Sequence, residues 1–242
     1  MDRFFLSPDG WASEALSLGG EEGHHAVRVM RKKVGDEIEL FDGRGRWAKG
    51  VVRELGRSVL TVEKVAEGSD EPLFPRVELA VSVPKGKTMD LVVQKAVELG
   101  VNGIHPLITS NSVVKVGADE AEEKSAKWQR VALEACKQCG QNFLPEVAPV
   151  KRLEDYLSGK REGSKVIASL APGAVPVRER LESLGDDSRE VHLLVGPEGD
   201  FTEDETRAAL AAGFEPVSLG EIVLRVETAC LFLASVIRYR FG

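Results

Sequence analysis

The carboxy-terminal part of the sequence holds three short loops, each of which follows an apparent strand. They are Gly196-Pro-Glu-Gly-Asp200, Leu219-Gly220 and the turn Ile222-Val-Leu-Arg-Val226, which leads into a helix. Ligands of open α/β sheets collect at the carboxyl ends of the strands, and glycine lets backbone amides approach a ligand closely. The three loops therefore predict a binding site that is lined largely by backbone.

Two kinds of charged side chain accompany these loops. Pro197 limits the freedom of the first loop, so that Glu198 is a carboxylate on a stiff turn, while Arg225 lies just before a predicted helix whose first turn holds Glu227. Taken singly, each feature has a structural explanation, namely a tight turn, a helix cap or a surface arginine. Taken together, they place an acid and a guanidinium beside the predicted pocket.

The elements that must position this site alternate along the chain after residue 75. We expect strands at 76–83, 104–108, 165–170, 191–195 and 215–218, and helices at 89–97, 121–138, 202–213 and 227–240. Thr202-Glu-Asp-Glu205 has the spacing of a capping box and sets the start of one helix. Such alternation predicts a mostly parallel sheet with helices on both faces.

The first 70 or so residues differ, because short strands follow one another there with glycines at the corners. Residues 37–41, 47–52 and 58–62 have strand character, which predicts a small β-barrel. Glycine, serine, acids and two prolines cluster at 67–75. We therefore expect two domains, 1–72 and 73–242.

Composition limits the classes of function. The 242 residues are 43% hydrophobic and 29% charged, and the net charge of −7 excludes a cationic nucleic-acid coat but allows a local basic patch. Three cysteines fit a reducing cytoplasm. The longest nearly apolar run, 229–237, is too short to cross a bilayer, and the amino terminus has no targeting segment. We expect a cytoplasmic protein.

Several patterns that suggest cofactor or metal sites have a simpler structural explanation. The glycines of 43–48 lead into a strand rather than a helix, so a hairpin turn is favoured over a dinucleotide site. Cys136 and Cys139 have metal-ligand spacing without a second pair of ligands, and we predict an ordinary helix face and no metal. His105 and His192 lie in apolar settings, where we expect core histidines with satisfied hydrogen bonds.

Blocks of sequence along the whole chain match the signature of one known family. They include Val195-Gly-Pro-Glu-Gly-Asp-Phe201, Leu219-Gly-Glu-Ile-Val-Leu-Arg-Val-Glu-Thr-Ala229 and Gln94-Lys-Ala-Val-Glu-Leu-Gly-Val101. These blocks resemble the RsmE family of the SPOUT superfamily of methyltransferases. His25-Ala-Val-Arg-Val-Met-Arg31, Leu40-Phe-Asp-Gly43 and Glu134-Ala-Cys-Lys-Gln-Cys-Gly140 are also similar to that family. The resemblance implies a PUA-like barrel for RNA docking, a carboxy-terminal trefoil knot, a homodimer and S-adenosylmethionine bound in the knotted loops.

The resemblance also implies which residues bind the methyl donor. By position in the motifs they are Val195, Gly196, Glu198, Gly199, Leu219, Gly220, Ile222, Leu224 and Ala229. Backbone groups and apolar side chains of this kind can hold an adenine without the acidic ribose contact of dinucleotide sites.

Methylation at N3 of a uridine, the reaction of the family, assigns roles to the charged side chains. Loss of the N3 proton spreads negative charge onto O2 and O4, which a guanidinium stabilises, so Arg225 is the expected group facing the base. Glu198 or Glu227 is the expected proton acceptor, although a helix-capping role competes for Glu227.

Three positions depart from the family pattern. Asp200 stands where the family usually has a second glycine, and Asn111 and Gln141 stand where it often has arginine. The last two changes weaken expected RNA contacts, which an RNA-facing set of cations can replace. That set is Arg3, Arg28, Arg31, Lys85 and Lys87.

The sequence thus predicts an S-adenosylmethionine-dependent methyltransferase acting on N3 of a uridine in the 16S rRNA of the small ribosomal subunit. The sequence is also compatible with two alternative functions. One is another SPOUT reaction such as ribose 2′-O-methylation, and the other is a non-catalytic RNA-binding or ribosome-assembly protein that has kept the fold.

Overall fold

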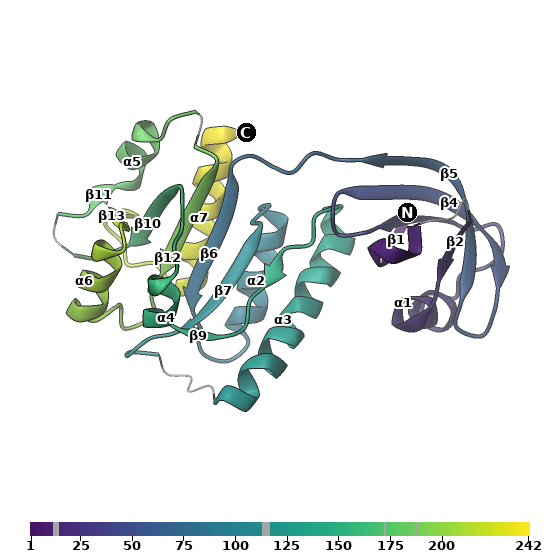
Figure 1. Ribbon diagram of the computed structural model, residues 1–242, viewed down its shortest axis with the longest axis horizontal. Helices are drawn as coiled ribbons and strands as arrows, with labels where there is room; N and C mark the ends of the chain where they lie inside the picture. Colours follow the sequence, from purple (N-terminus) through teal and green to yellow (C-terminus); the bar gives the residue numbers. More distant parts are fainter. Residues whose placement is uncertain (12–14, 113–116, 172, 187) are drawn as a thin grey trace. The chain divides into compact units, whose positions relative to one another are not determined.

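The structure is a computed structural model that describes residues 1–11, 15–112, 117–171, 173–186 and 188–242. The chain forms two compact units (Figure 1). Unit 1 comprises Met1–Pro72 and Leu133–Leu144, and unit 2 comprises Leu73–Ala132 and Pro145–Gly242. The segment 133–144, which the sequence places in the second domain, therefore packs with the first unit.

Unit 1 is built on a five-stranded sheet with the strand order β1-β3-β4-β5-β2. The strands are β1 (Asp2–Phe5), β2 (Ala15–Leu18), β3 (Glu37–Phe41), β4 (Arg46–Leu55) and β5 (Leu60–Ser69). The three predicted strands are β3, β4 and β5, whereas β1 and β2 have only four residues each and carry too little pattern to be predicted. Short helical turns, η1 (Pro8–Trp11), α1 (Gly20–His24) and η2 (His25–Val29), complete the unit.

The returning segment is held to the sheet of unit 1 by buried polar contacts. Arg3 donates to the carbonyl of Cys136 over 2.7 Å and to Glu39 over 3.0 Å, and its side chain is only 8% exposed. The amide of Asn142 donates to Asp70 over 2.7 Å. These contacts explain why residues 133–144 belong to unit 1.

Unit 2 contains an eight-stranded sheet in which all the strand pairs of the described residues are parallel. Its order is β11-β13-β10-β12-β6-β7-β8, with β9 also paired to β7. The strands are β6 (Arg76–Ser82), β7 (Gly103–Ile108), β8 (Glu146–Val147), β9 (Lys151–Arg152), β10 (Ser164–Ala168), β11 (Val175–Pro176), β12 (Glu190–Val195) and β13 (Glu215–Ser218). The helices are α2 (Thr88–Glu98), α3 (Ala118–Cys139), α4 (Leu153–Ser158), α5 (Val177–Ser183), α6 (Glu203–Ala211) and α7 (Val226–Phe241). The last residues of α3, from Leu133 on, belong to unit 1.

Helices cover both faces of this sheet, as the sequence predicts. On one face α7 packs against α2 and against β6 and β12, and on the other α4 and α6 pack together (Figure 1). Leu153, Tyr156 and Ala209 of α4 and α6 join a buried cluster with the strand residues Ile167 and Leu194. Burial of these apolar side chains is the main force that fixes the helices on the sheet.

The predicted helix boundaries near the site are confirmed. The capping box of α6 is formed by Thr202 and Glu205, each of which accepts the backbone N–H of the other. Arg225 is the N-cap residue of α7, and its carbonyl accepts the first helical hydrogen bond, from Ala229 over 2.8 Å. Arg225 and Glu205 are therefore fixed at the two helix starts that follow the glycine loops.

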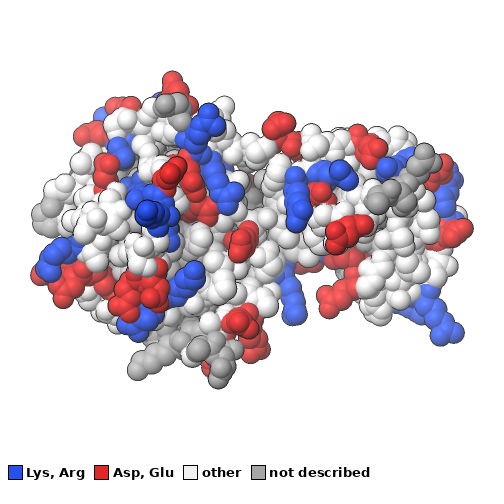
Figure 2. Space-filling model, viewed as in Figure 1, with Lys and Arg blue, Asp and Glu red and all other residues white. Residues whose placement is uncertain are grey.

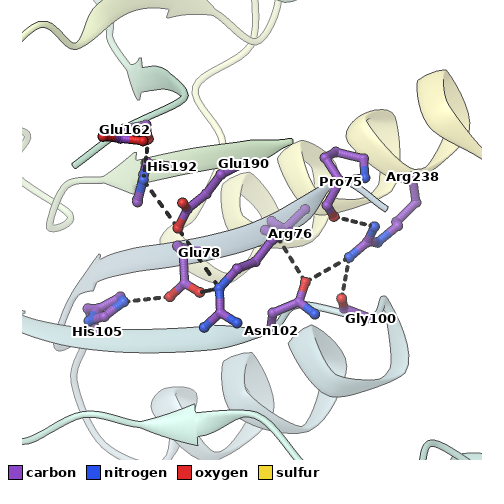
Figure 3. Close-up of polar contacts among 11 residues, drawn as sticks. Pro75, Arg76, Glu78, Gly100, Asn102, His105, Glu162, Glu190, His192 and Arg238 are labelled. Carbon is purple, nitrogen blue, oxygen red and sulfur yellow. Dashed lines mark hydrogen bonds and ion pairs between the residues drawn. The ribbon is translucent and has the colours of Figure 1, made fainter. Parts of the chain in front are cut away.

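The amino-terminal ends of β6, β7 and β12 are closed by ion pairs (Figure 3). Glu78, which is 4% exposed, lies 2.7 Å from the Arg76 guanidinium and 2.7 Å from the His105 ring. Burial acts to raise the pKa of Glu78, but the hydrogen bond with His105 and the charge of Arg76 outweigh it and hold the pKa below its ordinary value. Beside them, Arg238 donates to the carbonyl of Pro75 over 2.8 Å.

Candidate active site

A pocket opens at the opposite end of the sheet, where β10, β12 and β13 lie side by side and end together. β12 is inserted between β6 and β10, although both precede it in the chain. This strand order brings loops far apart in sequence to one edge. The pocket has a volume of about 230 Å³. Its lining comprises Ala168, Ser169, Leu170, Val195, Gly196, Pro197, Glu198, Asp200, Leu219, Gly220, Ile222, Val223, Leu224, Arg225, Val226 and Ala229.

The loop between β12 and α6 has a fixed backbone. A Cβ on Gly196 would lie 2.9 Å from the ring of Phe201, which is itself buried, so only glycine fits there. Asp200 has a φ of 59°, in the left-handed region that favours glycine, and its carboxylate accepts the N–H of Phe201 over 2.8 Å. Position 200 thus has a backbone conformation that suits glycine, the residue that the resemblance implies there.

The loop after β13 is more open. Gly220 has a φ of 120°, and the following side chains of Ile222 and Val223 are 79% and 69% exposed. This loop therefore lines the pocket with backbone and with apolar side chains that point away from the core of unit 2.

The structure brings nearly all the predicted donor-binding residues into this one pocket. Val195, Gly196, Glu198, Leu219, Gly220, Ile222, Leu224 and Ala229 line it, whereas Gly199 lies in the same loop outside the lining. The sequence does not predict Ala168, Ser169 and Leu170, because the end of β10 carries no glycine. They become candidates only when the strand order places β10 between β12 and β13.

Of the three predicted catalytic residues, two line the pocket. Arg225 is exposed at its rim, and Glu198 is exposed and accepts the backbone N–H of Lys85 over 3.4 Å. Glu227 lies half-buried in the first turn of α7 and is not part of the lining. The geometry therefore favours Glu198 over Glu227 as a group that meets a substrate.

The predicted RNA-facing cations divide into two kinds. Arg28 and Arg31 in unit 1 and Lys85 and Lys87 in unit 2 are exposed. Arg3 instead uses its guanidinium for the buried contacts described above and for a position 4.7 Å over the ring of Phe41. Figure 2 shows Lys and Arg interspersed with Asp and Glu on the face in view. Any RNA contact on that face must accordingly be local, and Arg3 does not belong to the exposed set.

The remaining cysteines and histidines have structural surroundings. Cys136 is buried, which raises its pKa to about 12, and Cys139 is exposed. His192 is buried with Nε2 3.0 Å from the Glu162 carbonyl, but Nδ1 has no partner, so the expected core histidine is only partly satisfied. His105 is half-buried rather than in the core. In the described part of the chain no group of three such side chains and acids is placed to hold a metal.

Comparison with known proteins identifies the family. The family model of an RNA methyltransferase domain matches residues 70–238, and that of an RNA methyltransferase PUA domain matches residues 18–65. Ribosomal RNA small subunit methyltransferase E of Bacillus subtilis is 30% identical over 99% of this chain and 97% of its own length. The chain belongs to the RsmE family of RNA methyltransferases. The Aquifex aeolicus member is 32% identical over 96% of this chain and 97% of its own.

Solved structures support the same assignment. An RsmE protein of Neisseria gonorrhoeae bound to S-adenosyl methionine has a TM-score of 0.86 and 29% identity, covering 98% of this chain and 97% of that one. A Legionella pneumophila protein with bound SAM has a TM-score of 0.87 and 30% identity, covering 98% and 96% of the two chains. The fold is therefore that of SPOUT methyltransferases with a PUA-like domain, as the sequence predicts. No helix in the described ranges is long and apolar enough to span a membrane.

Proposed function

We propose that this RsmE-family chain transfers the methyl group of S-adenosylmethionine to N3 of a uridine in 16S rRNA. The observation that carries the proposal is the pocket at the ends of β10, β12 and β13, where the family's signature residues meet an exposed arginine. Relatives across the full length of the chain bear the name of the small-subunit rRNA methyltransferase, and one was solved with the methyl donor.

The pocket suits the donor in its chemistry. Its walls consist of backbone at Gly196 and Gly220 and of apolar side chains such as Leu219 and Leu224, which suit an adenosine moiety. We assign the donor to the lining residues that the sequence predicts, with Ala168, Ser169 and Leu170 added from the structure. When bound, S-adenosylmethionine supplies an electrophilic methyl group on a positively charged sulfur.

The acceptor base is assigned to the rim beside Arg225. Uridine N3 is a poor nucleophile until it loses its proton, and the resulting charge spreads onto O2 and O4. Arg225, held at the start of α7, donates to those oxygens and stabilises the charge as it forms. Glu198 accepts the N3 proton, because its carboxylate lines the same pocket.

RNA docking is assigned to the exposed cations of each unit. Arg28 and Arg31 lie on and just after η2 in unit 1, within the exposed stretch that precedes β3. Lys85 and Lys87 follow β6 in unit 2, and the backbone of Lys85 contacts Glu198 of the pocket loop. Cations at these places bind phosphate and leave base selection to the pocket.

Four further expectations from the sequence belong to this proposal. The insertion of β12 between β6 and β10 supports the trefoil knot that the resemblance implies. The exposed Phe232 and Tyr239 on α7 support a homodimer, since large apolar side chains on a terminal helix are typical of an interface. We also assign the protein to the cytoplasm and assign no metal to its reaction.

Mass spectrometry of nucleosides from digested 16S rRNA tests the proposal. RNA from a strain that lacks the gene should lose one 3-methyluridine, and the purified protein with the donor should restore it. Loss of a 2′-O-methylnucleoside instead would assign a different SPOUT reaction. Calorimetry with S-adenosylmethionine provides the second test, because a protein that only binds RNA has no need of the donor.

A further inference from the structure

The loop that forms one wall of the pocket is tied to a second loop outside the pocket. Asn111, in the turn after β7, places its side-chain nitrogen 3.2 Å from the carbonyl oxygen of Gly199 and 2.9 Å from that of Asp200. A primary amide has two N–H donors, so one side chain can satisfy both carbonyls. The contact joins residues 88 and 89 positions apart in the chain, and no sequence motif predicts it.

The turn that carries Asn111 is itself anchored to the sheet. The hydroxyl of Ser82, at the end of β6, is fully buried and lies 3.1 Å from that of Thr109 and 2.9 Å from that of Ser112. The N–H of Thr109 donates to the hydroxyl of Ser112 over 2.8 Å. A cluster of hydroxyls in which each finds a partner gives a rigid support. Asn111 thus projects from a turn whose position is fixed by β6.

A second contact from the same turn fixes the far end of the pocket loop. The N–H of Ser110 donates to Glu205 over 2.7 Å, and Glu205 is the capping-box residue of α6. Partial burial acts to raise the pKa of Glu205, but backbone hydrogen bonds from Thr202 and Ser110 outweigh it and lower the pKa. The segment from Gly199 to Glu205 is thereby held at both ends by residues 110 and 111.

We propose that Asn111 is a positioning residue for the methyl donor. Asp200 has a backbone conformation that costs energy for any residue with a side chain and that persists only when its surroundings hold it. The Asn111 amide supplies that support through the two carbonyls, so the loop is ordered before the donor arrives and the donor does not bear the ordering cost. The inference rests on the proposed function, since it concerns the same pocket.

Variants at position 111 test this role. Asn111→Ala removes both hydrogen bonds, and Asn111→Asp removes the donors at nearly constant size and turns carboxylate oxygens toward the two carbonyls. Both should raise the calorimetric Kd for S-adenosylmethionine about tenfold, the effect of losing one or two hydrogen bonds. Asn111→Gln, which keeps the amide, should lie closer to the wild type. Because Asn111 is exposed, Tm should fall by no more than about 2 °C.

The readouts separate positioning from the alternatives. Kinetics should show a higher KM for the donor with the KM for RNA unchanged. An unchanged donor Kd in Asn111→Ala, with a raised KM for RNA, would make Asn111 an RNA contact and overturn the proposal. If the wild type itself fails to bind the donor, the proposed function fails, and amide hydrogen exchange then decides the role of Asn111. The amides of Asp200 and Phe201 should exchange faster in Asn111→Ala than in the wild type, and equal rates would refute the positioning role.

Discussion

The two ends of the parallel sheet in unit 2 use polar residues in opposite ways. At the amino-terminal end, Glu78 is 4% exposed and paired on two sides, by Arg76 and His105 (Figure 3). At the carboxyl end, Glu198 and Arg225 are exposed and stand on loops whose walls are backbone and apolar side chains. The same sheet therefore carries charges that are paired with one another at its amino-terminal end, the closed end, and charges that face solvent at its carboxyl end, the open end.

We infer from this difference that the charges at the amino-terminal end serve stability and those at the carboxyl end serve the proposed function. Charges that are satisfied by protein partners lower the free energy of the fold and have little left to offer a ligand. Charges that face solvent on fixed loops contribute little to folding but are available to a substrate. Substitutions at the two ends should accordingly change different measurements.

The largest effect is expected at the open end, from Arg225→Ala. Loss of the guanidinium should lower kcat by at least about a hundredfold, because charge on the uridine oxygens is no longer stabilised. The donor Kd should change by less than about threefold, since the Arg225 backbone remains at the start of α7. Single-turnover methylation and calorimetry measure the two quantities. If donor affinity is lost together with activity, Arg225 has a structural role, and the two ends of the sheet do not differ in the way that we infer.

At the closed end, Glu78→Gln should act on stability alone. Replacement of the buried carboxylate by a neutral amide removes the negative charge that faces Arg76 and His105 and should lower the free energy of unfolding at pH 7 by about 2 kcal/mol. Donor affinity should not change. Denaturant unfolding of the variant, with Glu198→Gln as the exposed match that keeps its stability, checks both statements.

The difference in stability between the wild type and Glu78→Gln should decrease at low pH. The pKa of Glu78 is lowered in the folded protein, so its contribution is complete above the ordinary value of 4.5 and is lost as the pH falls through the folded pKa. The stability gap between wild type and Glu78→Gln should therefore narrow as the pH is lowered from 7 toward 3. A gap that stays constant over this range would show that the carboxylate charge does not stabilise the fold.

A smaller effect is expected from Gly220→Ala in the open loop. At a φ of 120° any side chain strains the backbone, although nothing lies within 4 Å of the new methyl group. The loop should shift and raise the donor Kd about tenfold. Gly213→Ala is the matched control, because Gly213 has a φ of 88° at the end of α6 and does not line the pocket. Gly213→Ala should lower the stability and leave the donor Kd unchanged. Equal donor Kd values in the two variants would show that Gly220 does not shape the donor pocket.

The smallest effect is expected from substitutions in unit 1, where exposed and buried arginines can be compared in the same way. Arg28→Glu with Arg31→Glu should weaken RNA binding severalfold and reduce the dependence of log K on log salt by about 2, with stability retained. Arg3→Ala should instead lower the stability and leave RNA binding unchanged, because the Arg3 guanidinium makes its contacts inside unit 1. Filter binding over a range of salt concentrations and thermal unfolding distinguish them. RNA binding that is unaltered in the double variant would remove η2 from the docking surface.

Much of the fold follows from local patterns. The apolar positions Met89, Val92, Val93 and Ala96 are buried on one face of α2 as the helical period predicts, and the capping box at Thr202 starts α6. What the sequence does not predict depends on contacts distant in the chain. The four-residue β1 and β2 form by pairing with β3 and β5, and their own residues are too few to show a period.

The candidate site, too, can be predicted only in part from the sequence. The glycine loops and Arg225 can be found from sequence, because glycine types and helix starts are local signals. The contribution of β10 cannot, since Ala168, Ser169 and Leu170 join the pocket only through the strand order. The burial of Arg3 is equally invisible, because its partner carbonyl belongs to Cys136, 133 positions away. A sequence motif thus indicates the chemistry of a site, whereas the strand order determines which other residues line that site.

The return of residues 133–144 to unit 1 means that this unit is discontinuous in sequence. A fragment cut after residue 72 would leave Asp70 without Asn142 and Arg3 without the Cys136 carbonyl. A graft of this unit that keeps these contacts must therefore carry the end of α3 and the residues up to 144 together with residues 1–72.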